Sequence, residues 1–162
     1  MVNAGIAGVF RGSGRIGDAV LVGEERLAGL GLEDDSALTL PDGARLCDRV
    51  SASSELLEGC TRLALPVVRG LTVATVTTSD ATAARLVARY EPDVETMEGF
   101  AVLRAAQAAR VPALEVRGIS NYVGDRSKSE WNFSAGRGAL LAVLGDVLDC
   151  VGVAFPSGKS GA

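Results

Sequence analysis

The stretch V-E-T-M-E-G-F-A at residues 94–101 begins as a short apolar strand and continues as a helix. It places two carboxylates, Glu95 and Glu98, at the junction between the two. The stretch V-R-G-I-S-N-Y-V-G-D at residues 116–125 predicts a strand that ends in a polar loop opening with Asn121. In a parallel α/β sheet both segments would end at the carboxyl edge of the strands, where ligands bind. Together they predict a pocket that binds a sugar and a purine base.

Strand patterns and helix patterns alternate along the rest of the chain. The predicted elements are strands at residues 17–25, 71–76, 94–97 and 113–119, and helices at residues 53–63, 81–90, 99–109 and 134–153. This alternation is typical of a three-layer α/β fold, in which helices flank a mixed, mainly parallel sheet. We expect one domain over residues 1–155 and a flexible tail over residues 156–162.

Three local patterns add detail to this expected fold. The opening V-N-A-G-I-A-G predicts the end of a strand that runs into a Gly-rich turn at residues 5–8. Pro41-Asp42-Gly43 predicts a turn. One face of the helix at residues 99–109 carries small residues, which predicts a ridge packed closely on the sheet. These residues are Ala101, Ala105, Ala108 and Ala109.

Charge and composition exclude several classes of function. The net charge of −4 argues against a nucleic-acid partner, because that function needs a basic face. The chain contains no histidine, which excludes Ser–His and Cys–His catalysis, histidine zinc sites and histidine general bases. Acid–base chemistry would fall to carboxylates, amides, Lys, Tyr or water. We expect neither a metal ion nor a cofactor.

The cysteines and the apolar segments point to a cellular location. Cys47, Cys60 and Cys150 are odd in number and have no metal-binding spacing. We interpret them as reduced, mostly buried thiols. The residues after Met1 do not form a signal peptide, and no apolar run is long enough to cross a bilayer. We therefore expect a cytoplasmic protein with no membrane partner.

Each candidate site residue also has an ordinary structural explanation. Glu98 fits a first-turn carboxylate that the helix dipole favours, or an acceptor for two adjacent hydroxyls. Asn121 fits a loop turn, or an amide that offers a base edge one donor and one acceptor. Residues 5–8 fit a tight turn, and Thr77, Thr78 and Ser79 fit a helix cap. Trp131 either covers a pocket or fills a core, and the residues alone leave these alternatives open.

Five segments, in order along the chain, carry a family resemblance. They are N-A-G-I-A-G, G-D-A-V-L-V-G-E-E-R, T-V-T-T, V-E-T-M-E-G-F-A and V-R-G-I-S-N-Y-V-G-D-R. Together they resemble the purine nucleoside phosphorylase and nucleosidase superfamily over nearly the whole chain. Within it, they are most similar to the futalosine hydrolases of menaquinone biosynthesis, and next to the methylthioadenosine/S-adenosylhomocysteine nucleosidases. M-E-G and R-x-I-S-N at this separation are fairly specific, whereas the Gly-rich segment is not.

The resemblance implies roles for individual residues. Glu98 would bind the ribose hydroxyls, with Met97 packed on the sugar. Asn121, the catalytic candidate, stands where adenine-specific nucleosidases have an aspartate that protonates N7. Its amide N–H can hydrogen-bond O6 of a 6-oxopurine while its carbonyl accepts from a protonated N7, which favours hypoxanthine, the base of futalosine. Further substrate contacts are expected at Ala7, Gly8 and Thr96, and also at Ile6, Thr77, Glu95 and Trp131.

The resemblance also implies cleavage of an N-glycosidic bond, through an oxocarbenium-like transition state. In the phosphorylases of the superfamily, a hydroxyl residue in the Gly-rich turn helps to bind phosphate, but Ile6 stands there and offers no donor. We therefore expect hydrolysis of futalosine to hypoxanthine and dehypoxanthine futalosine. The alternatives are a 6-oxopurine nucleoside phosphorylase, a methylthioadenosine/S-adenosylhomocysteine nucleosidase-like enzyme, and a catalytically inactive nucleoside-binding protein.

Two further expectations follow from the resemblance. The family's domain has a first strand, a Gly-rich loop and a water-activating glutamate ahead of the N-A-G segment. We therefore expect this fold to be N-terminally incomplete and to lack that glutamate. Family members commonly form homo-oligomers whose neighbours help to close the pocket, so we expect a homo-oligomer that acts on a small-molecule nucleoside.

Overall fold

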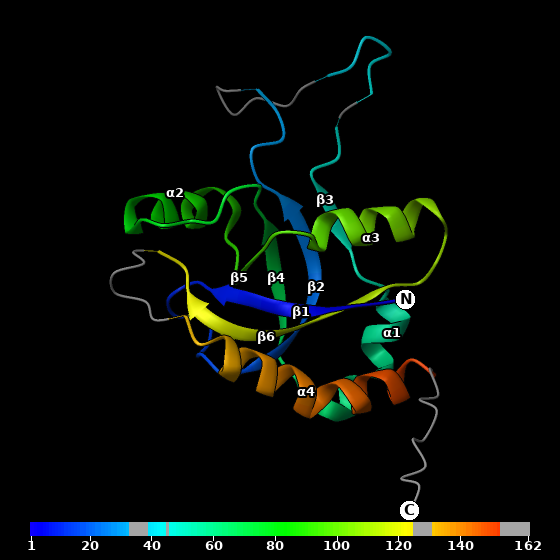
Figure 1. Cartoon of the computed structure of the whole chain (residues 1–162). Coiled ribbons are helices and arrows are strands. Elements are labelled where there is room, and N and C mark those ends of the chain that lie inside the picture. The colour runs from blue at the N-terminus through cyan, green and yellow to red at the C-terminus, as the bar shows by residue number, and fades with distance from the viewer. Residues whose placement is uncertain (33–38, 45, 125–130, 153–162) are drawn as a thin grey trace, which may run out of the picture.

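The computed structural model describes residues 1–32, 39–44, 46–124 and 131–152. Its six strands form one sheet in the order β3-β2-β4-β5-β1-β6 (Figure 1). The strands are β1 (Val2–Val9), β2 (Ala19–Leu27), β3 (Arg49–Ser51), β4 (Val67–Thr72), β5 (Val94–Thr96) and β6 (Leu114–Tyr122). The α/β class and the mixed sheet are confirmed. Parallel and antiparallel pairings are equally frequent, however, so the sheet is less parallel than expected.

β2 accounts for much of this mixture, because it pairs with three other strands. Residues 19–22 pair antiparallel with residues 115–118 of β6. On the same side, residues 24–26 pair with β3, while β4 pairs with residues 21–27 on the other side. A register shift between Val22 and Glu24 falls where these partners change, and such irregularities let a strand bend. Since β6 also lies beside β1, the strands β2, β4, β5, β1 and β6 close into a small barrel.

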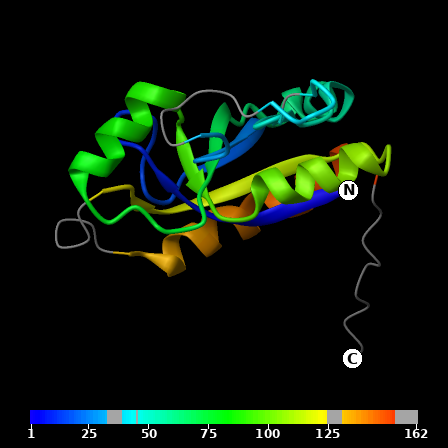
Figure 2. The same ribbon diagram turned by 90° about the horizontal axis from the view of Figure 1, so that it is seen from above.

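Helices cover the strands on two sides. They are α1 (Ser54–Gly59), a short 3-10 helix (Thr61–Leu63), α2 (Asp80–Tyr90), α3 (Gly99–Ala108) and α4 (Phe133–Cys150). α2 and α3 lie on one side of the sheet, and α1 and α4 on the other (Figure 1). Seen from above, α3 lies in front of the sheet and α4 behind it (Figure 2). The three-layer arrangement is therefore confirmed. None of the described helices is both long and apolar enough to cross a membrane.

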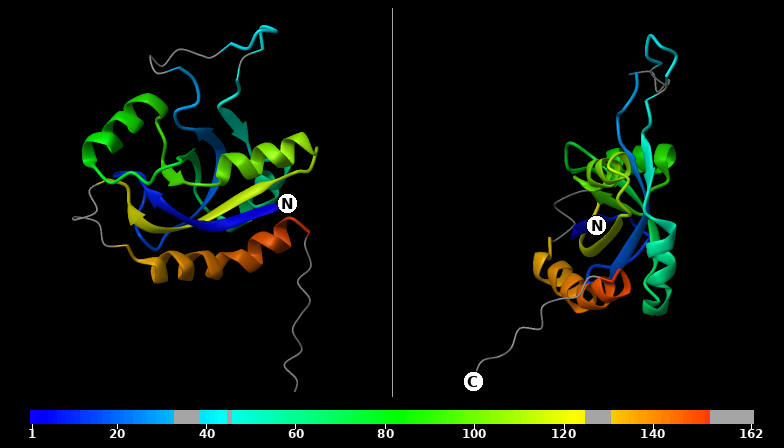
Figure 3. Two further views of the ribbon diagram at one scale, coloured as in Figure 1. Left: turned by 45° about the horizontal axis from the view of Figure 1, so that its top comes forward. Right: turned by 90° about the vertical axis from the view of Figure 1, so that its right-hand side faces the viewer.

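α4 packs closely along β1 and β6, which run side by side (Figure 3). The contact is closest at Gly118 of β6, where a Cβ atom would collide with the carbonyl oxygen of Gly136. Beyond this point, an apolar stripe of α4 packs on the cluster that holds Leu114 and Val116. The residues of the stripe in this cluster are Leu140, Leu144, Val147 and Val151.

Three predicted strand boundaries are wrong. V-N-A-G-I-A-G forms the continuous strand β1 with no turn at residues 5–8, because β6 pairs with β1 along its whole length and β5 pairs with it at Gly8 and Val9. β6 continues to Tyr122, so Asn121 lies inside a strand rather than opening a loop. β4 spans Val67–Thr72 instead of residues 71–76, because its pairing with β2 and β5 ends at Thr72.

The small-residue face of α3 does not pack on the sheet. α3 is buried through Phe100, Leu103 and Ala106, which contact Val50 and Ala113. Larger apolar side chains remove more surface from water than alanine does, so they decide which face of the helix is buried. The predicted ridge is exposed at all four positions, Ala101, Ala105, Ala108 and Ala109.

Other local predictions have mixed outcomes. Ser79 caps α2 by accepting from the N–H of Thr82, and the N–H of Gly43 donates to the carbonyl of Leu40 in the predicted turn. Cys60 is buried and Cys150 is partly buried. Cys47 is exposed, against expectation, because it precedes the short outer strand β3. The predicted tail at residues 156–162 lies outside the described residues, as do residues 153–155.

The interior of the barrel is part apolar and part polar. Apolar side chains of β1, β2, β5 and β6 fill one part. In the other part, beneath α3, Glu25 and Glu115 are completely buried. Arg117 donates from Nε to Glu115 at 2.8 Å, and the hydroxyls of Thr72 and Thr96 each donate to Glu25 at 2.8 Å. This part of the interior therefore holds two carboxyl groups and one cation, and the cation contacts Glu115.

Charge balance requires one of these carboxyl groups to keep its proton. Arg117 compensates one negative charge, and an uncompensated buried charge is costly. Burial, and secondarily the charge of Glu115, raises the pKa of Glu25 to about 8. Glu25 is therefore the carboxyl group that stays neutral at pH 7, while Glu115 forms the ion pair with Arg117.

Replacing Glu25→Gln should make the stability of the fold less dependent on pH. The pKa of Glu25 in the folded protein lies above its ordinary value of 4.5, so the stabilisation from its proton is complete below pH 4.5 and is lost as the pH rises to about 8. One pKa unit corresponds to about 1.4 kcal/mol. We therefore expect the unfolding free energy of the natural chain to fall by several kcal/mol relative to the variant across this window.

Urea unfolding at several pH values in this range measures the difference. Glu24→Gln is the matched control, because Glu24 is the adjacent residue and pairs with Arg49 on the surface. Parallel stability curves for the natural chain and Glu25→Gln would contradict the charge assignment.

Candidate active site

β1 brings the two predicted functional segments together. Gly8 pairs with Glu95 of β5 on one side and with Asn121 of β6 on the other. The register with β6 shifts between Ala7 and Gly8, because β6 has an extra residue, Ser120, at this point. Such a bulge redirects the side chains that follow it. As a result, Asn121 rather than Ser120 lies opposite Gly8.

A pocket with a volume of about 190 Å³ lies over these strands. All predicted site residues except Thr77 line it, namely Ile6, Ala7, Gly8, Glu95, Thr96, Met97, Glu98, Asn121 and Trp131. Val76 and Ser120 also line the pocket but were not predicted. Ser120 could have been predicted from its neighbour Asn121, whereas an isolated valine such as Val76 does not indicate a site. The structure thus gathers residues from five separate segments of the chain around one cavity.

The amide of Asn121 has a fixed orientation. The side chain is 5% exposed, its Oδ1 accepts from the Ser120 hydroxyl at 2.8 Å, and its Nδ2 donates to the Tyr122 carbonyl at 3.2 Å. A Cβ atom at Gly8 would come within 3.0 Å of Nδ2, so the approach of Asn121 requires glycine there. An amide has two N–H donors and two acceptor lone pairs. One donor and one acceptor therefore remain for a ligand.

Glu95 is a buried carboxyl group in the wall of the pocket. It is 7% exposed, and its Oε1 accepts from the N–H of Thr77 at 3.1 Å. Within the described part of the chain, its Oε2 is buried without a hydrogen-bond partner. Burial raises the pKa of Glu95, although the hydrogen bond from Thr77 acts in the opposite direction. Thr77 therefore acts on the pocket through Glu95 rather than by lining it.

Met97 and Glu98 follow β5 directly and are both exposed. Glu98 is at the N-cap position of α3, but its side chain does not bond to the N–H groups of the first turn. No hydrogen bond or ion pair engages its carboxylate among the described residues. A capping role therefore does not explain Glu98, and both carboxylate oxygens are open to a ligand.

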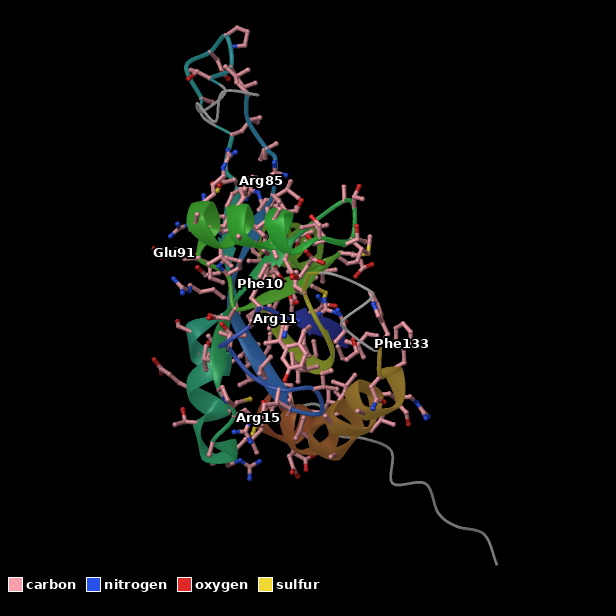
Figure 4. The ribbon with its side chains drawn as sticks, turned by 90° about the vertical axis from the view of Figure 1, so that its left-hand side faces the viewer. Phe10, Arg11, Arg15, Arg85, Glu91 and Phe133 are labelled. Atoms are coloured by element: carbon pink, nitrogen blue, oxygen red, sulfur yellow. The ribbon has the colours of Figure 1, made fainter. Side chains whose placement is uncertain are left out.

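Trp131 belongs to the pocket rather than to a core. Its ring centroid lies 5.1 Å from that of Phe133, which is 54% exposed at the start of α4 (Figure 4). On the loop after β1, the Arg11 guanidinium lies 5.4 Å from the ring centroid of Tyr122 (Figure 4). Trp131 and Phe133 thus form an aromatic pair beside the pocket.

The described lining of the pocket contains two carboxyl groups and no lysine or arginine. The side chain of Ile6, at the place where a phosphate-binding hydroxyl was considered, is a hydrocarbon. A phosphate ion needs cationic side chains or several directed N–H and O–H donors. The pocket therefore suits a neutral ligand that carries hydroxyls and a polar base edge.

Comparison with known families identifies the fold. Residues 1–148 match the family model described as the phosphorylase superfamily. The chain belongs to this superfamily. The resemblance carried by the five segments is thereby confirmed at the level of the superfamily. A solved member with the same fold is the methylthioadenosine/S-adenosylhomocysteine nucleosidase of Colwellia psychrerythraea in complex with adenine. It has a TM-score of 0.75 and 20% identity, with 92% of this chain and 66% of that chain covered.

Two curated relatives within the superfamily are more similar in sequence. The futalosine hydrolase of Thermus thermophilus is 37% identical over 149 residues, covering 86% of this chain and 65% of the relative. The futalosine hydrolase of Streptomyces coelicolor is 33% identical over 148 residues, covering 90% of this chain and 63% of the relative. The chain thus spans just under two thirds of the length of these relatives.

Replacing Gly8→Ala should impair the pocket more than the fold. The new Cβ would lie 2.9 Å from Val123 Cγ2 and 3.0 Å from Asn121 Nδ2, so the amide would have to move. We expect hypoxanthine to bind about 10-fold more weakly, as for one lost hydrogen bond, with about 1–3 kcal/mol lost in stability. Calorimetric titration with hypoxanthine measures the first effect and urea unfolding the second.

Gly138→Ala is the matched control, because a Cβ atom at Gly138 meets nothing within 4 Å. It should leave hypoxanthine affinity unchanged. Unchanged affinity in Gly8→Ala would show that the base does not contact Asn121 in the orientation described.

Proposed function

We propose that this superfamily member hydrolyses the N-glycosidic bond of futalosine, releasing hypoxanthine and dehypoxanthine futalosine. The oriented amide of Asn121 at the floor of the pocket is the observation that carries this proposal. Its remaining N–H and carbonyl lone pair match O6 and a protonated N7 of a 6-oxopurine. The names of the two curated relatives support the same substrate. The free thiols support a cytoplasmic location for the reaction.

The other lining residues have complementary roles in this proposal. Glu98 accepts hydrogen bonds from the ribose hydroxyls with its unengaged carboxylate, and the thioether of Met97 packs on the sugar. Ala7, Gly8 and Thr96 form the wall against which the nucleoside lies. Contacts of this kind hold the sugar while positive charge develops on it in the transition state.

Water is the proposed nucleophile, because the described lining carries negative rather than positive charge. A phosphorylase would have to bring phosphate close to Glu95 and Glu98 without a cation to compensate. Whether cleavage requires phosphate therefore distinguishes a nucleosidase most clearly from a 6-oxopurine nucleoside phosphorylase.

The rate at which hypoxanthine is released from futalosine should not depend on phosphate. Glu98→Gln should lower kcat/KM about 10- to 100-fold, because a charge-assisted hydrogen bond is worth about 1.5–3 kcal/mol. Its unfolding free energy should change little, since Glu98 is exposed and unpaired within the described residues. Chromatographic measurement of hypoxanthine, with urea unfolding alongside, tests both expectations.

Other results would assign a different function. Release that requires phosphate would identify a phosphorylase, and preferential cleavage of methylthioadenosine would identify an adenine-specific nucleosidase. Binding of futalosine without release would identify a nucleoside-binding protein. A Glu98→Gln variant that loses folding without a separate kinetic effect would contradict the ribose role.

We also propose that the protein forms a homo-oligomer through the exposed face of α3. A groove of about 560 Å³ runs along this face, lined mainly by apolar residues that include Ala101, Ala105 and Ala108. Met97 lines both this groove and the nucleoside pocket. The pocket is smaller than the roughly 300–1,000 Å³ of typical ligand sites. A second copy on the groove would therefore both bury apolar surface and extend the pocket.

Replacing Ala105→Arg should reduce the mass of the particle in solution. The charged side chain would lie in the apolar groove, where burial without a partner is costly, but it would not enter the core of one chain. Ala142→Arg, at an exposed position on α4, is the control and should keep the oligomer intact. Size-exclusion chromatography with light scattering makes the comparison, and a monomeric natural chain would contradict the proposal.

A further inference from the structure

Glu95 carries a buried carboxylate oxygen that the fold does not use. The residue lies in the middle of β5 and lines the pocket. Oε1 accepts from the backbone of Thr77, but Oε2 has no partner in the described structure. Buried polar atoms are almost always hydrogen-bonded, so an unpaired acceptor in a pocket wall points to a ligand.

The other buried carboxyl groups are better compensated than Glu95. Arg117 compensates the charge of Glu115 through Oε1, although Oε2 of Glu115 also has no hydrogen-bond partner in the described structure, and each oxygen of Glu25 accepts from a threonine hydroxyl. No lysine or arginine among the described residues pairs with Glu95, and its hydrogen bonds there come from Thr77. Burying this carboxyl group therefore costs free energy that no ion pair in the described structure offsets.

Glu95 lies across β1 from Asn121. Gly8 pairs with both residues, so the two side chains flank the same point on the central strand. Adjacent strands are about 4.8 Å apart, which places the backbones of β5 and β6 about 10 Å from each other at this register. Gly8 has no side chain to fill the space between them. A flat heterocycle can therefore reach Asn121 with one part of its edge and Glu95 with another.

We propose that Glu95 is a specificity-determining residue, whose Oε2 accepts a hydrogen bond from N1–H of the 6-oxopurine that Asn121 holds through O6 and N7. The inference rests on the proposed function for the class of base, but not for the cleavage step. Along the base edge, N1–H, O6 and N7 are successive polar groups, so one carboxylate and one amide read all three.

This arrangement distinguishes 6-oxopurines from adenine. Hypoxanthine presents a donor at N1, which satisfies the free carboxylate oxygen. Adenine presents an acceptor at N1, so two lone pairs would face each other in a buried site. Sites built around a specific hydrogen bond reject ligands that leave their buried groups unpaired. Glu95 therefore excludes adenine at N1, while Asn121 selects the oxo group at O6.

Equilibrium binding of free bases tests this assignment without requiring catalysis. Calorimetric titration compares hypoxanthine, 1-methylhypoxanthine and adenine on the natural chain and on Glu95→Gln. The natural chain should bind hypoxanthine about 10- to 100-fold more tightly than 1-methylhypoxanthine, the size expected for a charge-assisted bond. Glu95→Gln should weaken hypoxanthine by a similar factor and should gain affinity for adenine, because its amide N–H can donate to N1.

Glu58→Gln is the matched control, since Glu58 is exposed on α1 and lies outside the pocket. It should bind all three bases as the natural chain does. In Glu95→Gln, inosine and hypoxanthine should weaken by the same factor, because the lost contact is to the base. Loss of inosine affinity alone would place Glu95 at the sugar and overturn the proposal.

Two further results would also overturn it. The first is equal affinity of the natural chain for hypoxanthine and 1-methylhypoxanthine, which needs no variant to fold. The second is failure of the natural chain to bind hypoxanthine at all. Cleavage of futalosine is a separate measurement: activity with no role for Glu95 would refute this inference alone, and Glu95-dependent binding without cleavage would refute the proposed reaction alone.

Discussion

The position of β1 between β5 and β6 is the constraint on which the site depends. Its pairings bring residues near the start of the chain beside two segments from its second half. At Gly8, both pairings meet at one register point, and the polar side chains of Glu95 and Asn121 face the same cavity. A turn at residues 5–8 would have removed this alignment. The small residues of β1 therefore lie between the part of the pocket that β5 forms and the part that β6 forms.

Local signals in the sequence predicted a large part of the fold and of the site. The β5–α3 junction and the cap at Ser79 depend on neighbours within a few residues, and both were predicted well. Asn121 was recognised as a site residue even though its strand was taken for a loop. Nearly all the lining residues could be named because the resemblance to the superfamily, carried by five short segments, implied them.

Features that depend on distant partners could not be predicted in the same way. Glycine and alanine have weak β propensity, so β1 is a strand because two others pair with it. The bulge at Ser120 exists only relative to β1. The alanines of α3 have helical spacing but bury too little area to compete with Phe100 and Leu103. The buried Glu25 gave no signal, because an isolated glutamate normally indicates a surface position.

The pairing of β1 with β6 also has a consequence for how the chain folds. Val2 is the register partner of Leu114, so the pairing of β1 cannot be completed until a segment from the far part of the sequence has formed. Contacts of such long sequence separation are slow to form, because much chain entropy is lost before they stabilise anything. Until residues 114–122 have been synthesised, the edge of β1 that pairs with β6 remains unpaired. Transient protection of this strand by a chaperone would therefore favour correct assembly over aggregation.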